Sequence, residues 1–159
     1  MGIELYLVRP DATGRVIFPF WTRDGDDLPG IDARCIDSLK WATWHDPAQR
    51  LQAAGIGPRP DPIPPDQLVA GAGRGLRALL DELVPIHADF AALAAGAGND
   101  PDAVRALLWQ FASGEISVAD DTARQRVKAH AAGTFEGFVD LYQRILTGGR
   151  EGRFGCWSY

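Results

Sequence analysis

Long hydrophobic runs are missing from this sequence. No uninterrupted apolar stretch approaches the roughly 20 residues that a membrane-spanning helix needs. The first residues, MGIELYLVRPD, lack the basic segment followed by an apolar segment that marks a secretory signal. We therefore expect a cytoplasmic protein with no membrane partner.

Cysteine and positive charge are also scarce. Cys35 and Cys156 are the two cysteines in 159 residues, and at this separation in a cytoplasmic protein they are expected to be reduced thiols. The 16 lysine and arginine residues face 21 acidic residues, which leaves a formal net charge of -5. Such a chain repels phosphate backbones unless its basic groups cluster on one face, so nucleic acid is not an expected partner.

The familiar motifs of catalysis and metal binding are absent. There is no G-x-S-x-G nucleophile elbow, and the three histidines, His45, His87 and His130, contain no i, i+4 pair. The stretch GAGRGL at 71–76 lacks the third glycine of a dinucleotide-binding loop and has no predicted strand before it. We therefore expect no metal ion and no cofactor. The same absences favour a protein that is not an enzyme, without deciding the question.

Four aspartates lie in the stretch WTRDGDDLPGID, which ends at Asp32. A calcium loop of the EF-hand type needs an oxygen ligand at position five and glycine at position six, but a loop that starts at Asp24 has Leu28 and Pro29 there. The stretch is therefore predicted to be either a solvated acidic turn or a surface that faces a basic partner protein. In the second case the predicted binding residues are Asp24, Asp26 and Asp27.

The first part of the chain predicts a hairpin followed by helices. Apolar runs at 3–8 and 15–20 flank the turn-forming stretch RPDATG, which is typical of two hairpin strands. Asp32 is placed to cap a helix, because the apolar residues that follow it recur at helical spacing. A shorter helix is predicted between Asp46 and Gly55, and a proline-rich connector follows it.

The second part of the chain predicts long helices and a last strand. From Pro65 onward, leucine and alanine mark one helical face, and a further helix has Asp100 as its cap. The final helical region, 121–146, is expected to stop at Gly148 and Gly149, and an aromatic strand follows. The fold is therefore predicted to be a single α+β domain over 1–159, mainly helical and packed on a small sheet formed by an N-terminal hairpin and a C-terminal strand.

Three glycines in the predicted helix after Pro65 are unusual, because together they cost about 3 kcal/mol relative to alanine. Two explanations remain open. Either the helix starts late, near Gly75, or Gly71 and Gly75 allow another element to pack close to the helix.

Tryptophan is unusually frequent, with five residues. Trp41 and Trp44 are three positions apart on the helix predicted after Asp32, beside His45. The two rings either fill the core or form a recognition surface, in which tryptophan is enriched. Trp41, Trp44 and His45 are therefore the candidate lining of a small-molecule pocket.

Three parts of the sequence resemble the YfbM-like family of uncharacterised bacterial proteins. MGIELYLV is similar to its opening strand, PIPPDQLVAGAGRGLRALLDEL to its proline-started helix, and TFEGFVDLYQRILTGGREGRFGCWS to its closing helix, glycine turn and strand. The stretch IDSLKWATWHD is a looser echo of the aspartate, tryptophan and histidine region of that family. The resemblance implies a compact α+β domain of unknown activity and transfers no catalytic residue.

Two functions are expected from these observations. The first is a non-enzymatic protein-binding module of the bacterial cytoplasm, an immunity or accessory protein whose acidic surface meets a basic partner. The alternative is a small enzyme or small-molecule-binding protein with the tryptophan and histidine pocket. The sequence leaves the oligomeric state open.

Overall fold

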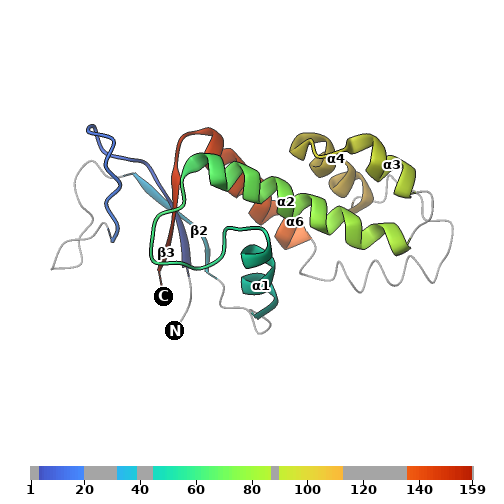
Figure 1. Cartoon of the computed structure of the whole chain (residues 1–159), viewed down its shortest axis with the longest axis horizontal. Helices are drawn as coiled ribbons and strands as arrows, with labels where there is room; N and C mark the ends of the chain where they lie inside the picture. Colours follow the sequence, from blue (N-terminus) through green and yellow to red (C-terminus); the bar gives the residue numbers. More distant parts are fainter. Residues whose placement is uncertain (1–3, 20–31, 39–44, 87–89, 113–135, 159) are drawn as a thin grey trace. The chain divides into compact units, whose positions relative to one another are not determined.

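A computed structural model describes residues 4–19, 32–38, 45–86, 90–112 and 136–158 of the chain (Figure 1). The described chain is mainly helical and has a small antiparallel sheet of three strands, which confirms the predicted α+β class. The strands are β1 (Glu4–Val8), β2 (Ala33–Ser38) and β3 (Phe154–Ser158). The helices are α1 (His45–Ala53), α2 (Pro65–Leu83), the short 3-10 helix η1 (Val84–Ile86), α3 (Phe90–Ala97), α4 (Pro101–Ala112) and α6 (Glu136–Arg150).

The chain divides into two compact units, which are described separately. The sheet unit comprises Met1–Gly71 and Arg144–Tyr159, and the helical unit comprises Ala72–Gln143. The boundary between them falls within α2 and within α6.

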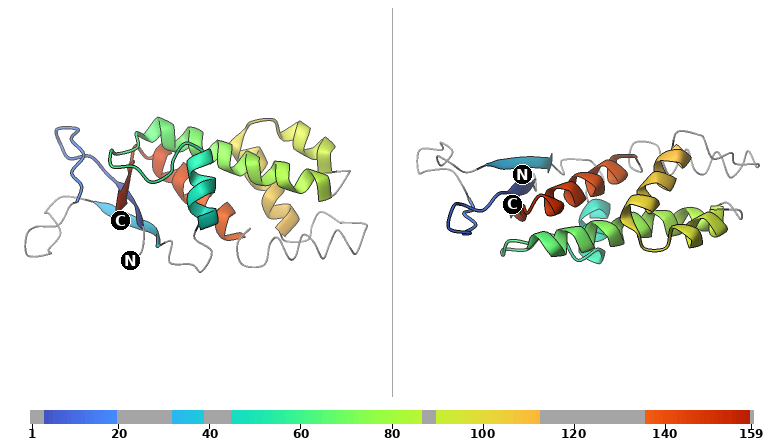
Figure 2. Two further views of the ribbon diagram at one scale, coloured as in Figure 1. Left: turned by 60° about the horizontal axis from the view of Figure 1, so that its bottom comes forward. Right: turned by 90° about the horizontal axis from the view of Figure 1, so that it is seen from above.

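The sheet joins the two ends of the chain, with the strand order β2-β1-β3 and both pairings antiparallel. Leu5 pairs with Trp157 and Leu7 with Gly155, so these residues share the face of the sheet on which the helices pack. Figure 2 shows the central β1 between its two neighbours. The prediction that the C-terminal segment completes a sheet with the first strand is therefore confirmed.

The predicted second hairpin strand, 15–20, is wrong over the residues that the structure describes, 15–19. Here the chain makes a turn in which the Asp11 carboxylate accepts hydrogen bonds from the backbone N–H groups of Thr13 and Arg15, both at 2.9 Å. Phe18 then lies against Tyr6, with ring centroids 5.7 Å apart. This run thus forms a connector, with Phe18 packed against β1, rather than a further strand of the sheet.

The helix predicted after Asp32 is also wrong over the residues that the structure describes, because 33–38 form β2, and the rest of that predicted helix, 39–44, lies outside the described residues. Asp32 precedes a strand and therefore caps no helix. The apolar residues of this segment have helical spacing. Its backbone hydrogen bonds are nevertheless made by pairing with β1 rather than within a helix. The helix after His45 was predicted correctly apart from its start, which falls at His45.

The glycines of α2 permit close packing. The helix begins at Pro65, so the late start near Gly75 is excluded. A Cβ on Gly71 would collide with the Ile56 side chain, and one on Gly75 would collide with the Tyr142 ring. Each contact lies within one unit, and each explains why alanine is absent at that position.

Gly148 and Gly149 have the same role in α6, which continues to Arg150 instead of stopping at them. A Cβ on Gly148 would collide with Leu7 of β1, and one on Gly149 would lie 2.8 Å from the carbonyl oxygen of Pro65. Gly152, two positions after the end of the helix, has a φ of 81°. The N–H of Arg153 donates to the Gly148 carbonyl (2.9 Å) and that of Gly152 to the Gly149 carbonyl (3.1 Å), the pattern of a Schellman motif.

The proline-rich connector after α1 returns to the sheet. The N–H of Ile63 donates to the Gly155 carbonyl (2.7 Å), and the N–H of Gly155 donates to the Ile63 carbonyl (2.9 Å). Ile56 and Ile63 are buried, and the Ile56 carbonyl accepts the indole N–H of Trp157 at 3.1 Å. The connector therefore covers the outer edge of β3 and part of the core of the sheet unit.

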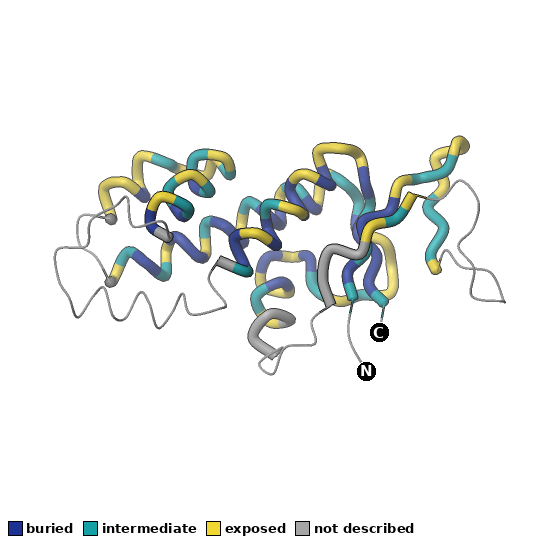
Figure 3. Tube along the Cα trace, turned by 180° about the vertical axis from the view of Figure 1, so that it is seen from behind, coloured by how far each residue is buried: buried dark blue, intermediate teal, exposed yellow. Residues whose placement is uncertain are grey.

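The helical unit follows the predicted apolar pattern closely. The apolar face predicted for α2 is buried throughout, both in the sheet unit (Leu68) and in the helical unit (Ala72, Leu76, Leu79, Leu80 and Leu83). Buried and exposed segments follow one another along the helix in Figure 3. Asp100 caps α4 as predicted, because its carboxylate accepts the N–H of Asp102 at 3.1 Å. The Arg77 guanidinium donates to the carbonyls of Ala94 and Gly98, both at 2.7 Å, and so satisfies the last turn of α3.

Candidate functional site

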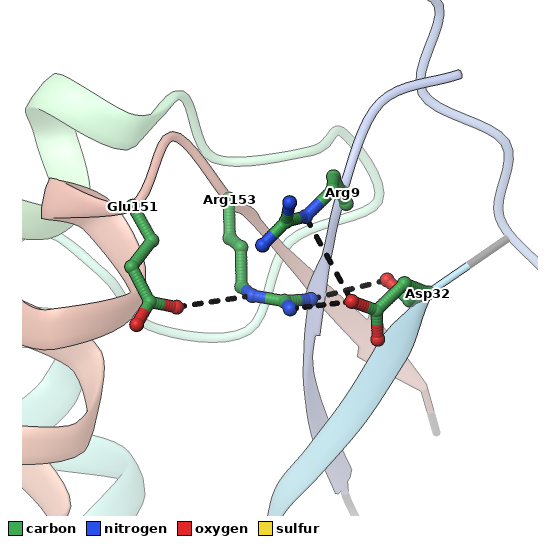
Figure 4. A network of polar contacts seen from close by, with 4 residues as sticks. All are labelled: Arg9, Asp32, Glu151 and Arg153. Atoms are coloured by element: carbon green, nitrogen blue, oxygen red, sulfur yellow. Dashed lines mark hydrogen bonds and ion pairs between the residues drawn. The ribbon is translucent and has the colours of Figure 1, made fainter. Parts of the chain in front are cut away.

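The most unusual side chain of the sheet unit is Arg153, which is fully buried. Its guanidinium donates to the Asp32 carboxylate at 2.7 Å, to the Asp32 carbonyl at 3.1 Å and to the Glu151 carboxylate at 3.4 Å (Figure 4). Arg9 lies at the rim, with its Nε 3.8 Å from the same Asp32 carboxylate. These four residues are named the Arg153 cluster below.

Three strand ends bring the Arg153 cluster together. Arg153 precedes β3 directly after the Schellman motif of α6, and Asp32 precedes β2. Arg9 follows β1, and its N–H donates to the Asp32 carbonyl at 3.0 Å. The cluster therefore ties all three strands together at one end of the sheet.

The charges of the cluster favour an ionised Asp32. The hydrogen bond from Arg153 holds the pKa of Asp32 below its ordinary value, and the positive charges of Arg153, Arg34 and Arg9 act in the same direction. Partial desolvation of the carboxyl opposes this shift. The cluster is a structural clamp on the backbone that enters β2, because all three guanidinium nitrogens of Arg153 donate to protein groups.

A second anchor lies near the other end of the connector between β1 and β2. The Asp11 turn is held by three hydrogen bonds to Thr13 and Arg15, and those bonds lower the pKa of Asp11. Phe18, at the end of the described connector, packs on Tyr6 of β1. The Tyr6 hydroxyl in turn donates to Glu4 at 2.6 Å. Residues on both sides of 20–31 are thus fixed to the sheet.

The structure describes none of the predicted binding side chains. Asp24, Asp26, Asp27, Trp41 and Trp44 lie outside the described residues. His45 is the first residue of α1, and its backbone alone is described. The acidic partner surface and the tryptophan-lined pocket therefore both stay predictions.

The two cysteines occupy equivalent positions on either side of β1, because Cys35 and Cys156 both pair with Tyr6. Two strand spacings separate their Cα atoms by about 10 Å, which exceeds the roughly 7 Å limit for a disulfide. Burial raises the pKa of Cys156 to about 11, so this thiol is protonated at neutral pH.

Within the described ranges, no three His, Cys, Asp or Glu side chains lie close enough together to hold a metal ion. None of the described helices combines the length and the apolar character that crossing a membrane requires.

Sequence reasoning missed the role of Arg153. The residue stands between Gly152 and Phe154, where an arginine before an apolar strand is expected to be solvated. Its partner Asp32 is 121 positions away in the sequence, so no local pattern connects the two. The one available signal was the aspartate itself, which sequence spacing assigned to a helix cap.

Comparison with protein-family models, with curated proteins and with solved structures finds no match to this chain in any of the three.

Proposed function

We propose that the protein is a non-enzymatic protein-binding module that presents the acidic connector between β1 and β2 to a basic partner. One observation carries the proposal: the described residues on both sides of 20–31 are anchored to the same sheet. Phe18 packs on Tyr6 before the acidic stretch, and Asp32 is held by the buried Arg153 after it.

This anchoring supports binding for a physical reason. Binding residues are commonly carried on connections between strands and positioned by a rigid scaffold. Fixing the ends of a connection reduces the conformational entropy that association must still remove. Three carboxylates close together in sequence, on a chain of net charge -5, also attract a basic partner over a longer range.

The more specific role that we propose is an immunity or accessory protein of the bacterial cytoplasm. It rests on the acidic surface and on the resemblance to the YfbM-like family. Complementary charge speeds the association of two proteins, and this supports such a role for an acidic connector that meets a basic target.

The test removes the charge of the connector. Changing Asp24, Asp26 and Asp27 to Asn should abolish capture of a basic partner from extracts of the native host. The loss should be largest at low ionic strength, where exposed charges are least screened. The variant should retain the melting temperature of the wild type, because surface substitutions usually change stability by less than about 0.5 kcal/mol.

A matched control separates the position of the charge from its amount. Asp61, Asp66 and Asp140 are exposed aspartates elsewhere on the chain, and changing them to Asn removes the same charge. This control variant should still capture the basic partner from the extracts. If both triple variants lose it equally, net charge rather than the connector is responsible. If a variant with Trp41 and Trp44 changed to Ala keeps the melting temperature of the wild type but loses the partner, the two tryptophans rather than the connector form the recognition surface.

A further inference from the structure

The two outer edges of the sheet differ. The outer edge of β3 is closed by the chain itself, through the two backbone hydrogen bonds between Ile63 and Gly155. The outer edge of β2 has no strand partner among the residues that the structure describes. In Figure 2, β2 lies at the margin of the sheet, on the side of β1 away from β3.

The hydrogen-bond pattern identifies the groups of β2 that face outward. In an antiparallel pair, residues whose N–H and C=O groups face the partner strand alternate with residues whose groups face away. The bond from Arg9 N–H to the Asp32 carbonyl makes 9 and 32 a bonded pair, so the groups of Ala33 and Cys35 point away from β1 while those of Arg34 point toward it. The outward bonds of Gly155, opposite Leu7, fit the same alternation.

We propose that this edge of β2 binds an extended segment of a partner protein as an added strand, with an acidic side chain opposite Arg34. The backbone groups of Ala33 and Cys35 supply the hydrogen bonds, as in other cases of strand addition. Arg34 is exposed and stands between them, where cross-strand side chains approach most closely. An acidic residue at that position is favoured, and a basic residue is repelled.

The same register argues against a second copy of this chain as the occupant. An antiparallel pairing that uses both Ala33 and Cys35 of each copy places Arg34 opposite Arg34 of the other copy. Like charges directly opposite each other destabilise a strand pair. The register shift between Leu5 and Tyr6 also marks a β-bulge in β2 beyond Cys35, which limits the binding edge to the first half of the strand.

The first test is amide hydrogen exchange in the free protein. The N–H groups of Ala33 and Cys35 should exchange at the rate of exposed amides, whereas that of Arg34, bonded to β1, should be protected. Equal protection at all three positions would show that the chain covers this edge itself, and would overturn the inference.

The second test uses synthetic peptides of alternating valine and threonine that carry one central glutamate, with one central lysine for comparison. A single charge is used because Asp32 lies two positions before Arg34, on the same face of the strand, and would repel a second glutamate. The glutamate peptide should slow exchange at Ala33 and Cys35, and a version with methylated backbone nitrogens should not. The lysine peptide should bind more weakly by roughly threefold. Changing Arg34 to Glu should reverse this preference. Binding without new protection at the two amides, or no binding of either peptide, would overturn the inference.

This inference is independent of the acidic connector. If the triple Asn variant of Asp24, Asp26 and Asp27 binds the peptides as the wild type does, strand addition at the β2 edge does not depend on the acidic connector. A failure of that triple variant to lose its basic partner then counts against the proposed function alone.

Discussion

Asp32 and Arg153 form one ion pair with two very different environments. The Arg153 side chain has an exposed fraction of 0%, whereas that of Asp32 is 50%. Removing the aspartate leaves a charged guanidinium in the protein interior, and removing the arginine leaves a carboxylate that water can reach. Removing the Asp32 side chain and removing the Arg153 side chain should therefore lower the free energy of unfolding by different amounts.

We expect Asp32→Ala to lower the free energy of unfolding by about 2 kcal/mol. This is less than the 3–5 kcal/mol typical of breaking a fully buried pair, because Asp32 is half exposed and Glu151 still contacts Arg153. Arg153→Met should cost less than Asp32→Ala. Urea unfolding measures both, with Arg15→Gln as an exposed control. An equal or reversed order would show that Arg153 tolerates the loss of its partner.

The same ion pair predicts that the free energy of unfolding depends on pH. The pKa of Asp32 is lowered from its ordinary value of 3.8 by the Arg153 hydrogen bond. Its contribution to stability is therefore complete well above pH 3.8, and it is lost as the pH falls through the lower pKa of the folded state. The difference in unfolding free energy between wild type and Asp32→Ala should be constant near neutral pH and shrink below pH 3.8.

Asp11 also has a lowered pKa, but it is present in both proteins, so its contribution cancels in this difference. Urea titrations at several pH values measure the effect. If the difference in unfolding free energy between wild type and Asp32→Ala stays constant until the protein unfolds in acid, Asp32 is not the ionised partner of Arg153.

At the scale of a secondary-structure element, α2 offers a matched pair of glycines. Gly73 and Gly75 are two positions apart in the same helix. A Cβ on Gly73 would lie 3.9 Å from Pro101, an ordinary contact, but a Cβ on Gly75 would enter the Tyr142 ring. The helical preference for alanine is the same at both sites, so the difference between them reports packing alone.

We expect Gly73→Ala to raise the free energy of unfolding by up to about 1 kcal/mol, through helix propensity. Gly75→Ala should lower it by about 1–3 kcal/mol, because overpacking outweighs that gain. Thermal or urea unfolding of the two variants provides the comparison. If both substitutions stabilise the protein, Tyr142 does not pack against α2 as described.

At the scale of the whole molecule, the sheet depends on the C-terminal residues. Removing Gly152–Tyr159 deletes β3, the buried Arg153 and the Trp157 indole that donates to Ile56. It also exposes one edge of β1 and leaves Ile63 without its partner Gly155. We expect this truncation to aggregate or to lose cooperative unfolding, as seen by size-exclusion chromatography and circular dichroism.

The matched control removes Tyr159 alone and leaves β3 complete. It should stay soluble and unfold cooperatively. A soluble longer truncation with a sharp thermal transition would show that β1 and β2 can form the sheet without the C-terminal strand.

The sequence by itself determined the elements whose buried faces follow from the spacing of their own apolar residues. The apolar face of α2, the Asp100 cap of α4 and the terminal aromatic strand follow from residues that are neighbours in the chain, because helical and strand periods are local properties. The α+β class followed from the same local patterns.

The tertiary structure decided what depends on distant partners. Residues 33–38 form a strand because β1 is available to pair with them, although their spacing is helical. Residue 148 lies inside α6 and is a glycine because Leu7 of β1 packs where a Cβ would be. Arg153 is buried because Asp32, 121 positions earlier, meets it at the end of the sheet. Such contacts join residues far apart in sequence, so a local pattern does not specify them.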